Sequence, residues 1–189
     1  MWRTVKWFIS VIMLVCILVI ILACALVIIR YLLQSTNRNQ AVTIKPTSSI
    51  IYFAYGSNLS SDNMYSRCGS DIEALGPAKL LDYDLTFDKR GYANIIPYSG
   101  KYVWGLVWRI DEDCLKALDI YEGYPTLYGR QTVAVELGQD NVAALVYIEP
   151  SDQSGGQPNR TYLEGKVIPG AKEHNLPLEW VNQLESYYK

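Results

Sequence analysis

One stretch of this sequence combines backbone and side-chain groups that could bind a charged ligand. Residues 52–60 read Tyr-Phe-Ala-Tyr-Gly-Ser-Asn-Leu-Ser, a β-prone segment followed by the turn Gly56-Ser57-Asn58 and a helix start at Ser60 or Ser61. A strand that runs through such a turn into a helix directs several backbone N–H groups at one point. The sequence therefore predicts a site for an anionic group or a polarised carbonyl oxygen.

A second stretch contains one carboxylate among aromatic residues. Glu122 comes at the expected end of a helix, before Gly123 and among Tyr121, Tyr124 and Tyr128. Aromatic surroundings can desolvate a carboxylate and raise its pKa toward the value that a general acid or base needs. The residues alone leave open that Glu122 is solvated near a helix C-terminus, where the helix dipole slightly disfavours it.

The turn has simpler explanations as well. Gly56 could serve only to make the turn, and Ser57 or Asn58 could serve only to cap the helix. The tyrosines could be ordinary core residues, as most of the 15 in the chain must be.

Other arrangements that carry chemistry are missing. The sequence has no Gly-x-Ser-x-Gly elbow, Walker loop, Rossmann fingerprint or His-Glu-x-x-His. His174, the single histidine, lies in a polar stretch, so we expect it at the surface and predict no catalytic triad and no metal site. We predict no cofactor. Cys16 and Cys24 lie in an apolar run, and we expect Cys68 and Cys114 to be buried thiols.

Charge distribution excludes one class of partner. Residues 1–33 contain three of the 17 Lys and Arg and none of the 19 Asp and Glu, so the remaining chain is clearly acidic. An acidic domain without a basic groove is a poor candidate for binding nucleic acid.

The chain divides into three parts. Residues 7–29 form an unbroken apolar run, which as a helix would rise roughly 35 Å and cross the ~30 Å core of a bilayer. A cleaved signal peptide is the alternative, but its apolar region usually has only about 7–15 residues. We therefore predict a transmembrane helix over residues 7–29, a polar linker over 34–49 and a globular domain over 50–189. Basic residues flank both ends of the run and leave its orientation undecided.

The domain is predicted to be α+β, a small mixed β-barrel with helices packed outside. Patterning predicts about seven strands, over residues 50–55, 72–75, 79–88, 93–97, 101–110, 130–137 and 142–148. Helices are expected over residues 60–67, 112–121, 161–173 and 178–188.

Four blocks of the domain, in order, resemble the gamma-glutamylcyclotransferase family. They are residues 52–59, residues 103–108 (Val-Trp-Gly-Leu-Val-Trp), the helix that leads to Glu122-Gly123, and residues 170–179 (Gly-Ala-Lys-Glu-His-Asn-Leu-Pro-Leu-Glu). The resemblance covers about residues 50–186 and implies a small mixed barrel with flanking helices. It also implies a reaction, the intramolecular cyclisation of a γ-glutamyl amide or γ-glutamyl-amino acid to 5-oxoproline with release of the amine or amino acid.

The same resemblance implies which residues form the site. Glu122 is expected to be the catalytic acid and base, and no enzyme nucleophile is needed. The substrate-binding residues are expected to be Tyr52, Phe53, Ala54, Tyr55, Gly56, Ser57, Asn58, Tyr128, Tyr147 and Tyr162.

The predicted anchor departs from the family pattern and leaves the natural substrate open. Because small γ-glutamyl compounds are cytosolic, we expect the domain on the cytoplasmic side. Two alternatives to an active enzyme remain, a non-catalytic module that binds a small ligand and a membrane-tethered interaction protein with a degenerate pocket. An orientation of Glu122 away from the Gly56 turn would favour the interaction protein. Nothing in the sequence predicts the oligomeric state.

Overall fold

The computed structural model describes residues 21–30, 49–150 and 153–187. The chain divides into two compact units, Met1–Lys45 and Pro46–Lys189. Of the transmembrane segment expected over residues 7–29, residues 21–29 are described and belong to a helix over residues 21–30, whereas residues 7–20 lie outside the described residues. The expected linker lies outside them too, except for Ser49. Within the described ranges, no helix has both the length and the apolar composition needed to span a bilayer.

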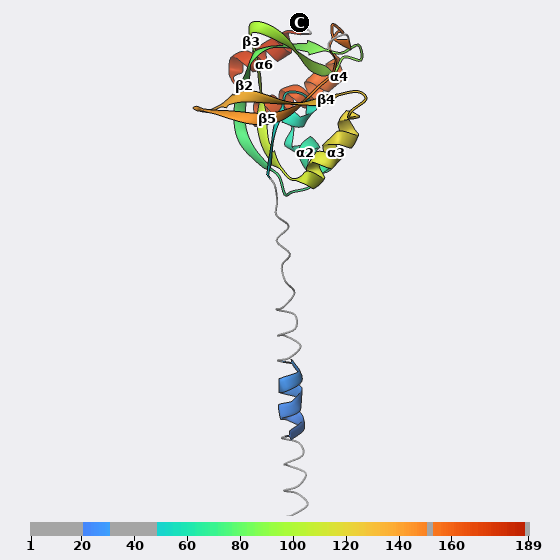
Figure 1. Ribbon diagram of the computed structural model, residues 1–189, viewed down its shortest axis with the longest axis vertical. Coiled ribbons are helices and arrows are strands. Elements are labelled where there is room, and N and C mark those ends of the chain that lie inside the picture. Colours follow the sequence, from blue (N-terminus) through green and yellow to red (C-terminus); the bar gives the residue numbers. More distant parts are fainter. Residues whose placement is uncertain (1–20, 31–48, 151–152, 188–189) are drawn as a thin grey trace, which may run out of the picture. The chain divides into compact units, whose positions relative to one another are not determined.

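The second unit is built on a closed β-barrel (Figure 1). Neighbouring strands follow the order β1-β3-β2-β4-β5, and β1 closes the barrel by pairing in parallel with β5 at Tyr52 and Leu145. The strands of the described residues are β1 (Ile50–Ala54), β2 (Glu73–Phe87), β3 (Ala93–Ile110), β4 (Gly129–Leu137) and β5 (Asp140–Ile148).

The prediction of about seven strands is wrong, because two pairs of expected strands are continuous. β2 runs through the Gly76-Pro77 break, where its register against β3 shifts between Ala74 and Gly76. A bulge of this kind bends a strand without ending it. Likewise, β3 continues past Pro97, which pairs with Tyr83, and reaches Ile110. The α+β class and the mixed barrel with flanking helices are confirmed.

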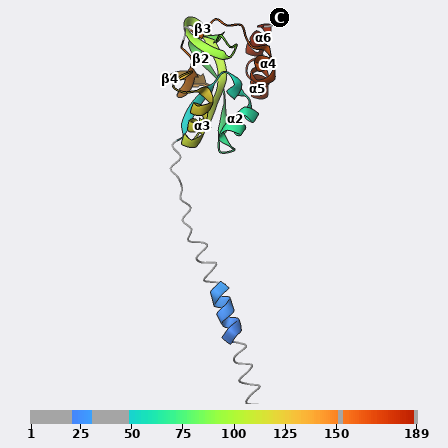
Figure 2. The same cartoon turned by 90° about the vertical axis from the view of Figure 1, so that its right-hand side faces the viewer.

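Helices cover the barrel at two places. The turn η1 (Ser57–Leu59) leads into α2 (Ser61–Cys68), which lies beside α3 (Glu112–Glu122) at one end of the barrel (Figures 1 and 2). The C-terminal helices gather along another side of it (Figure 2). They are α4 (Arg160–Tyr162), the π-helical η3 (Leu163–Val167), α5 (Ile168–Glu173) and α6 (Leu178–Ser186).

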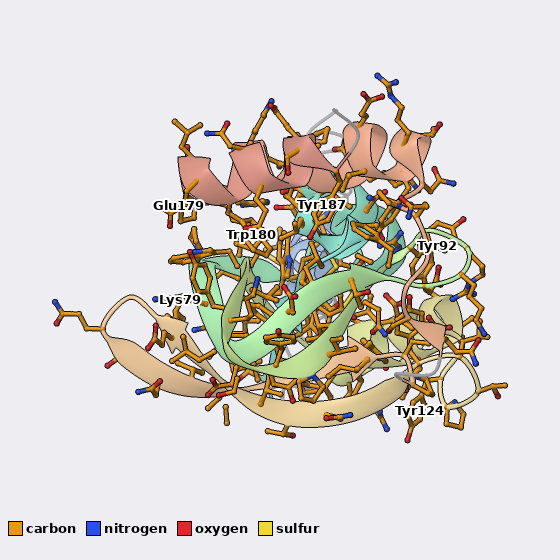
Figure 3. All side chains as sticks on the ribbon, turned by 90° about the horizontal axis from the view of Figure 1, so that it is seen from above. Lys79, Tyr92, Tyr124, Glu179, Trp180 and Tyr187 are labelled. Carbon is orange, nitrogen blue, oxygen red and sulfur yellow. A yellow bond between two sulfur atoms is a disulfide. The ribbon has the colours of Figure 1, made fainter. Side chains whose placement is uncertain are left out.

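The core fills the barrel and the space under these helices. Trp180 lies on the side of α6 that faces the strands (Figure 3), and Tyr187 packs edge-on against Phe87 at 4.9 Å between ring centroids. A Cβ on Gly105 would lie 2.3 Å from the Ala54 carbonyl oxygen, so glycine lets β1 close tightly on β3. The largest fully buried side chains are Trp108, Trp180, Phe53, Leu59, Met64, Ile95, Leu106, Ile110, Leu118, Leu163, Leu184 and Val103.

The structure overturns one expectation about the cysteines. Cys68 and Cys114 are not free thiols but form a disulfide across 46 positions of sequence. Their isolated spacing gave no sign of this, because α2 and α3 become neighbours only in the folded barrel. The disulfide joins the last residue of α2 to the first turn of α3.

Candidate active site

The glycine turn is held in place from both sides. After β1, the backbone closes a short turn in which Leu59 N–H donates to the Gly56 carbonyl at 3.0 Å. The buried indole of Trp108 donates to the Asn58 carbonyl at 3.0 Å from the adjacent strand β3. Ser60 caps α2 by backbone geometry alone, without a side-chain hydrogen bond. The simple explanation of Asn58 as a helix cap therefore fails, because its side chain points elsewhere.

Asn58 connects the turn to Glu122. Its Nδ2 donates to Glu122 Oε1 at 3.0 Å and to the hydroxyl of Tyr52 at 2.8 Å. Glu122 thus faces the Gly56 turn, and the orientation that would have favoured a degenerate pocket is not found. The two stretches that the sequence singled out, 64 positions apart, meet directly.

Local signals place Glu122 at the end of α3. The helix starts at Asp111, whose side chain accepts a hydrogen bond from Cys114 N–H at 2.8 Å. Leu115 and Leu118 bury one face of α3 against the barrel. The helix ends after Glu122 because Gly123 adopts the left-handed conformation (φ 64°) that favours glycine. These features fix Glu122 where the chain leaves the helix.

The environment of Glu122 suits proton transfer at neutral pH. Burial raises the pKa of the Glu122 carboxyl to about 7, against the opposing effects of the Arg67 charge and the hydrogen bond from Asn58. A carboxyl with this pKa is present in both protonation states near pH 7, so it can take up a proton and return it. The alternative of an ordinary solvated glutamate does not fit this environment.

A cavity of about 250 Å³ joins the turn, Glu122 and a set of tyrosines. All but two of the predicted site residues line it. The exceptions are Phe53 and Ala54, which are buried in the core as part of β1. The predicted residues that line the cavity are Tyr52, Tyr55, Gly56, Ser57, Asn58, Glu122, Tyr128, Tyr147 and Tyr162.

Tyr162 lies directly over the glycine turn. Its hydroxyl accepts a hydrogen bond from Ser57 N–H at 3.1 Å. A Cβ on Gly56 would lie 2.6 Å from the same hydroxyl, so glycine is needed for this approach. The segment is anchored by Asn159, whose side chain accepts from Tyr162 N–H at 2.9 Å. Tyr162 then precedes the π-helical η3, a form of helix that often occurs at functional sites.

The other tyrosines form a buried hydroxyl network. Tyr55 donates to the Tyr147 carbonyl at 2.7 Å, and the Tyr147 hydroxyl donates to Asp119 at 2.7 Å. Burial raises the pKa of Tyr52, Tyr55, Tyr128 and Tyr147 well above its usual range. These side chains therefore stay protonated and act as neutral hydrogen-bond donors.

Sequence comparison assigns the chain to a family. The sequence model of the family described as gamma-glutamyl cyclotransferase, AIG2-like, matches residues 52–166. The chain belongs to this family. A gamma-glutamylcyclotransferase of Homo sapiens is 30% identical over 158 residues, which cover 77% of this chain and 82% of the relative. That of Bos taurus is 30% identical over 149 residues, covering 73% and 78%. A solved gamma-glutamyl cyclotransferase structure superimposes with a TM-score of 0.67 at 28% identity, covering 74% of this chain and 88% of the other.

Several residues that line the cavity of this gamma-glutamyl cyclotransferase family member were not predicted from the sequence. Arg90 and Tyr92 line the cavity from the segment between β2 and β3. Arg90 donates to Asp88 at 2.7 Å and to Glu149 at 3.1 Å, and both carboxylates are buried. The Asp88-x-Arg90 spacing at the end of β2 was a weak signal for the ion pair between these two residues. No sequence signal indicated the contact with Glu149, which is 59 positions away from Arg90.

His174 is not at the surface as expected. Its side chain is partly buried and packs edge-on against Trp108, with 5.5 Å between the ring centroids. The His174 Nε2 atom lies 3.0 Å from Ser61 Oγ. Burial lowers the pKa of the imidazole. Neither His174 nor Ser61 lines the cavity, so this contact ties α5 to the start of α2. Among the residues that the structure describes, no three His, Cys, Asp or Glu side chains cluster as metal ligands.

Proposed function

We propose that this chain converts a γ-glutamyl amide or γ-glutamyl-amino acid into 5-oxoproline and a free amine or amino acid. The observation that carries the proposal is the contact between Glu122 and Asn58 inside the cavity, at 3.0 Å. It brings a carboxylate with a pKa of about 7 to the backbone turn that can hold the rest of the substrate.

The proposed reaction needs one proton carrier and no enzyme nucleophile. The substrate's α-ammonium group loses a proton to the Glu122 carboxylate, and the resulting amine attacks the γ-carbonyl carbon. A ring forms as the carbonyl electrons move onto oxygen. When the oxyanion collapses, the bond to the leaving nitrogen breaks, and Glu122 returns its proton to that nitrogen. The ring nitrogen still carries one hydrogen too many, and Glu122 relays this second proton to the released amine, which leaves as an ammonium while the ring becomes the neutral lactam. Glu122 ends the cycle as the carboxylate that began it.

The Gly56 turn supplies the fixed part of the site in this proposal. Backbone N–H groups of a rigid turn can stabilise a carboxylate or the developing oxyanion without moving during the reaction. Ser57 N–H donates to the Tyr162 hydroxyl, so a bound anion must share this donor or displace Tyr162. The buried tyrosine hydroxyls that line the cavity offer further hydrogen bonds to the substrate.

The test is the release of 5-oxoproline from a panel of γ-glutamyl-amino acids and γ-glutamyl amines. Glu122→Gln keeps the shape of the side chain and its ability to accept from Asn58, but it cannot carry the proton. Turnover should fall by about 10²–10⁴-fold. Glu179→Gln, on the exposed first turn of α6, is the matched control and should leave turnover unchanged.

Binding measured on the same proteins separates the enzyme from the binding module. If the unmodified domain binds the panel but releases no 5-oxoproline, the non-catalytic alternative is correct. Equal turnover by Glu122→Gln and the unmodified protein would remove Glu122 from the mechanism.

We also propose that residues 7–29 anchor the protein in a membrane. Their unbroken apolar run supports this, as do the exposed apolar side chains of residues 21–30. Resistance of the full chain to alkaline carbonate extraction is the expected result. Recovery of the intact chain in the soluble fraction would contradict the anchor.

Against the cytoplasmic side expected from the sequence, we propose an oxidising compartment for the domain, because Cys68 and Cys114 form a disulfide. Disulfides persist on the extracytoplasmic side and are rare in the cytosol. Protease protection in intact cells tests the side. Labelling with a bulky maleimide, with and without prior reduction, should show that Cys68 and Cys114 react only after reduction.

Asn159, exposed in an Asn-Arg-Thr sequence, is a second reporter of the compartment if that compartment glycosylates proteins, whereas Asn58 is too buried to react.

A further inference from the structure

The disulfide lies close in sequence to a charged residue of the Glu122 site. Cys68 ends α2, and its neighbour Arg67 extends over Tyr121, with the guanidinium carbon 3.5 Å from the ring centroid. Cys114 lies in the first turn of α3, and Glu122 ends that helix about two turns later, about 12 Å along its axis. The disulfide and the Arg67–Tyr121 stack therefore join α2 to α3 at the two ends of α3.

Arg67 also decides which way the Asn58 amide points. A guanidinium has donors and no acceptor, so only the amide oxygen of Asn58 can face it. Arg67 donates to Asn58 Oδ1, which leaves Nδ2 to face Tyr52 and Glu122. If the amide turned over, its oxygen would face the Glu122 carboxylate and repel it.

We propose that Arg67 is a positioning residue for Glu122 and that the Cys68–Cys114 disulfide holds Arg67 in place. This inference rests on the role proposed for Glu122. Arg67 does not line the cavity, so it acts through Asn58 and through its charge rather than on the substrate. Its positive charge lowers the pKa of Glu122, which burial alone would raise further. Arg67 thereby keeps a larger share of Glu122 ionised at neutral pH.

The other titratable groups that interact electrostatically with Glu122 carry no charge that would oppose the effect of Arg67 on its pKa. They are tyrosine hydroxyls, which burial keeps neutral by raising their pKa above the usual range. Tyr52 lies in β1 and Tyr55 directly follows it, while Tyr128 lies in the loop after α3 and Tyr162 in α4.

Reduction of the disulfide should therefore lower activity, although neither cysteine lines the cavity. A dithiol reductant supplies two electrons and two protons, is itself oxidised to a disulfide, and leaves Cys68 and Cys114 as thiols. The start of α3 is then no longer bonded to the end of α2, and the Arg67–Tyr121 stack loses its covalent support. The pKa of Glu122 should rise, and turnover near pH 7 should fall.

An NMR titration of ¹³C-labelled glutamate side chains tests the role of Arg67 independently of activity. Glu122→Gln identifies the resonance by its disappearance. Arg67→Met keeps the aliphatic stem but removes the charge, and the Glu122 midpoint should move up by about one pH unit or more. Arg67→Lys keeps the charge and should restore much of the original midpoint. An unchanged midpoint in Arg67→Met would overturn the proposal.

A double-mutant cycle tests the disulfide. Replacing both cysteines by serine should raise the Glu122 midpoint in the natural sequence and have no further effect in the Arg67→Met background. Equal shifts in both backgrounds would show that the disulfide does not act through Arg67. If the serine variant does not fold, the unmodified protein treated with dithiothreitol under native conditions replaces it. Turnover of γ-glutamyl-amino acids, measured in parallel, tests the proposed reaction separately, because the titration needs no catalysis.

Discussion

The hydroxyl of Tyr162 occupies the space where a side chain on Gly56 would begin. The distance from a Gly56 Cβ to this oxygen would be 2.6 Å, and the next nearest atoms are at 3.5 Å or beyond. The Gly56 turn and the C-terminal helices are thus fitted to each other through one glycine and one tyrosine.

Gly56→Ala should therefore destabilise the domain by about 1–3 kcal/mol, because the new methyl group displaces Tyr162. In a Tyr162→Phe background the same change should cost less, because the hydroxyl is gone. Urea unfolding of the two single variants and the double variant measures this coupling. Gly165→Ala, where a Cβ meets nothing within 4 Å, is the matched control and should not destabilise the domain. Additive effects would contradict the contact.

Activity should depend on the ionisation of Glu122. Since the pKa of Glu122 is raised to about 7 and the reaction begins with its carboxylate, kcat/KM should rise about tenfold per pH unit below pH 7 and then level off. A pH–rate profile checks this. Asn58→Ala removes a hydrogen bond that lowers the pKa, so the rising limb should move to higher pH. Asn182→Ala, on the exposed face of α6, should leave the limb in place.

Glu122 should also lower the free energy of unfolding of the domain as the pH rises. Its folded pKa lies above the model-peptide value of 4.5, so between about pH 4.5 and pH 7 the folded state binds more protons than the unfolded state. Stability contributed by this group is present below pH 4.5 and is lost as the pH rises through 7. Glu122→Gln should therefore raise the free energy of unfolding by about 1–3 kcal/mol at pH 8. At pH 4.5 the variant and the natural protein should differ little, and the opposite order would contradict the burial of this carboxyl.

The disulfide should contribute to stability through the unfolded chain. A crosslink that closes a loop across 46 positions restricts the unfolded ensemble, which corresponds to about 3–4 kcal/mol. Guanidinium unfolding with and without a reductant should show this loss. The variant with serine at both positions should unfold at the same denaturant concentration under both conditions. Sensitivity of that variant to the reductant would point to another cause.

Much of the candidate site could be predicted because its parts are local. A strand, a glycine turn and a helix start follow one another in residues 50–61, and Gly123 ends α3 after Glu122. Short-range hydrogen bonding and hydrophobic periodicity determine such features, so they are visible in the sequence. Strand ends were less predictable, because β2 continues through a bulge at Gly76 and β3 continues past Pro97, so that each long strand replaces two short ones.

The sequence by itself determined the parts of the site, its turn and its carboxylate, and the order of the elements that bear them. Only the tertiary structure decided that Asn58 meets Glu122, that Arg67 lies over Tyr121, and that Cys68 bonds to Cys114. Those contacts depend on how barrel closure and core packing bring α2 and α3 together. Long-range packing of this kind leaves no periodic trace in the chain, because it depends on the shape of the whole core rather than on neighbouring residues.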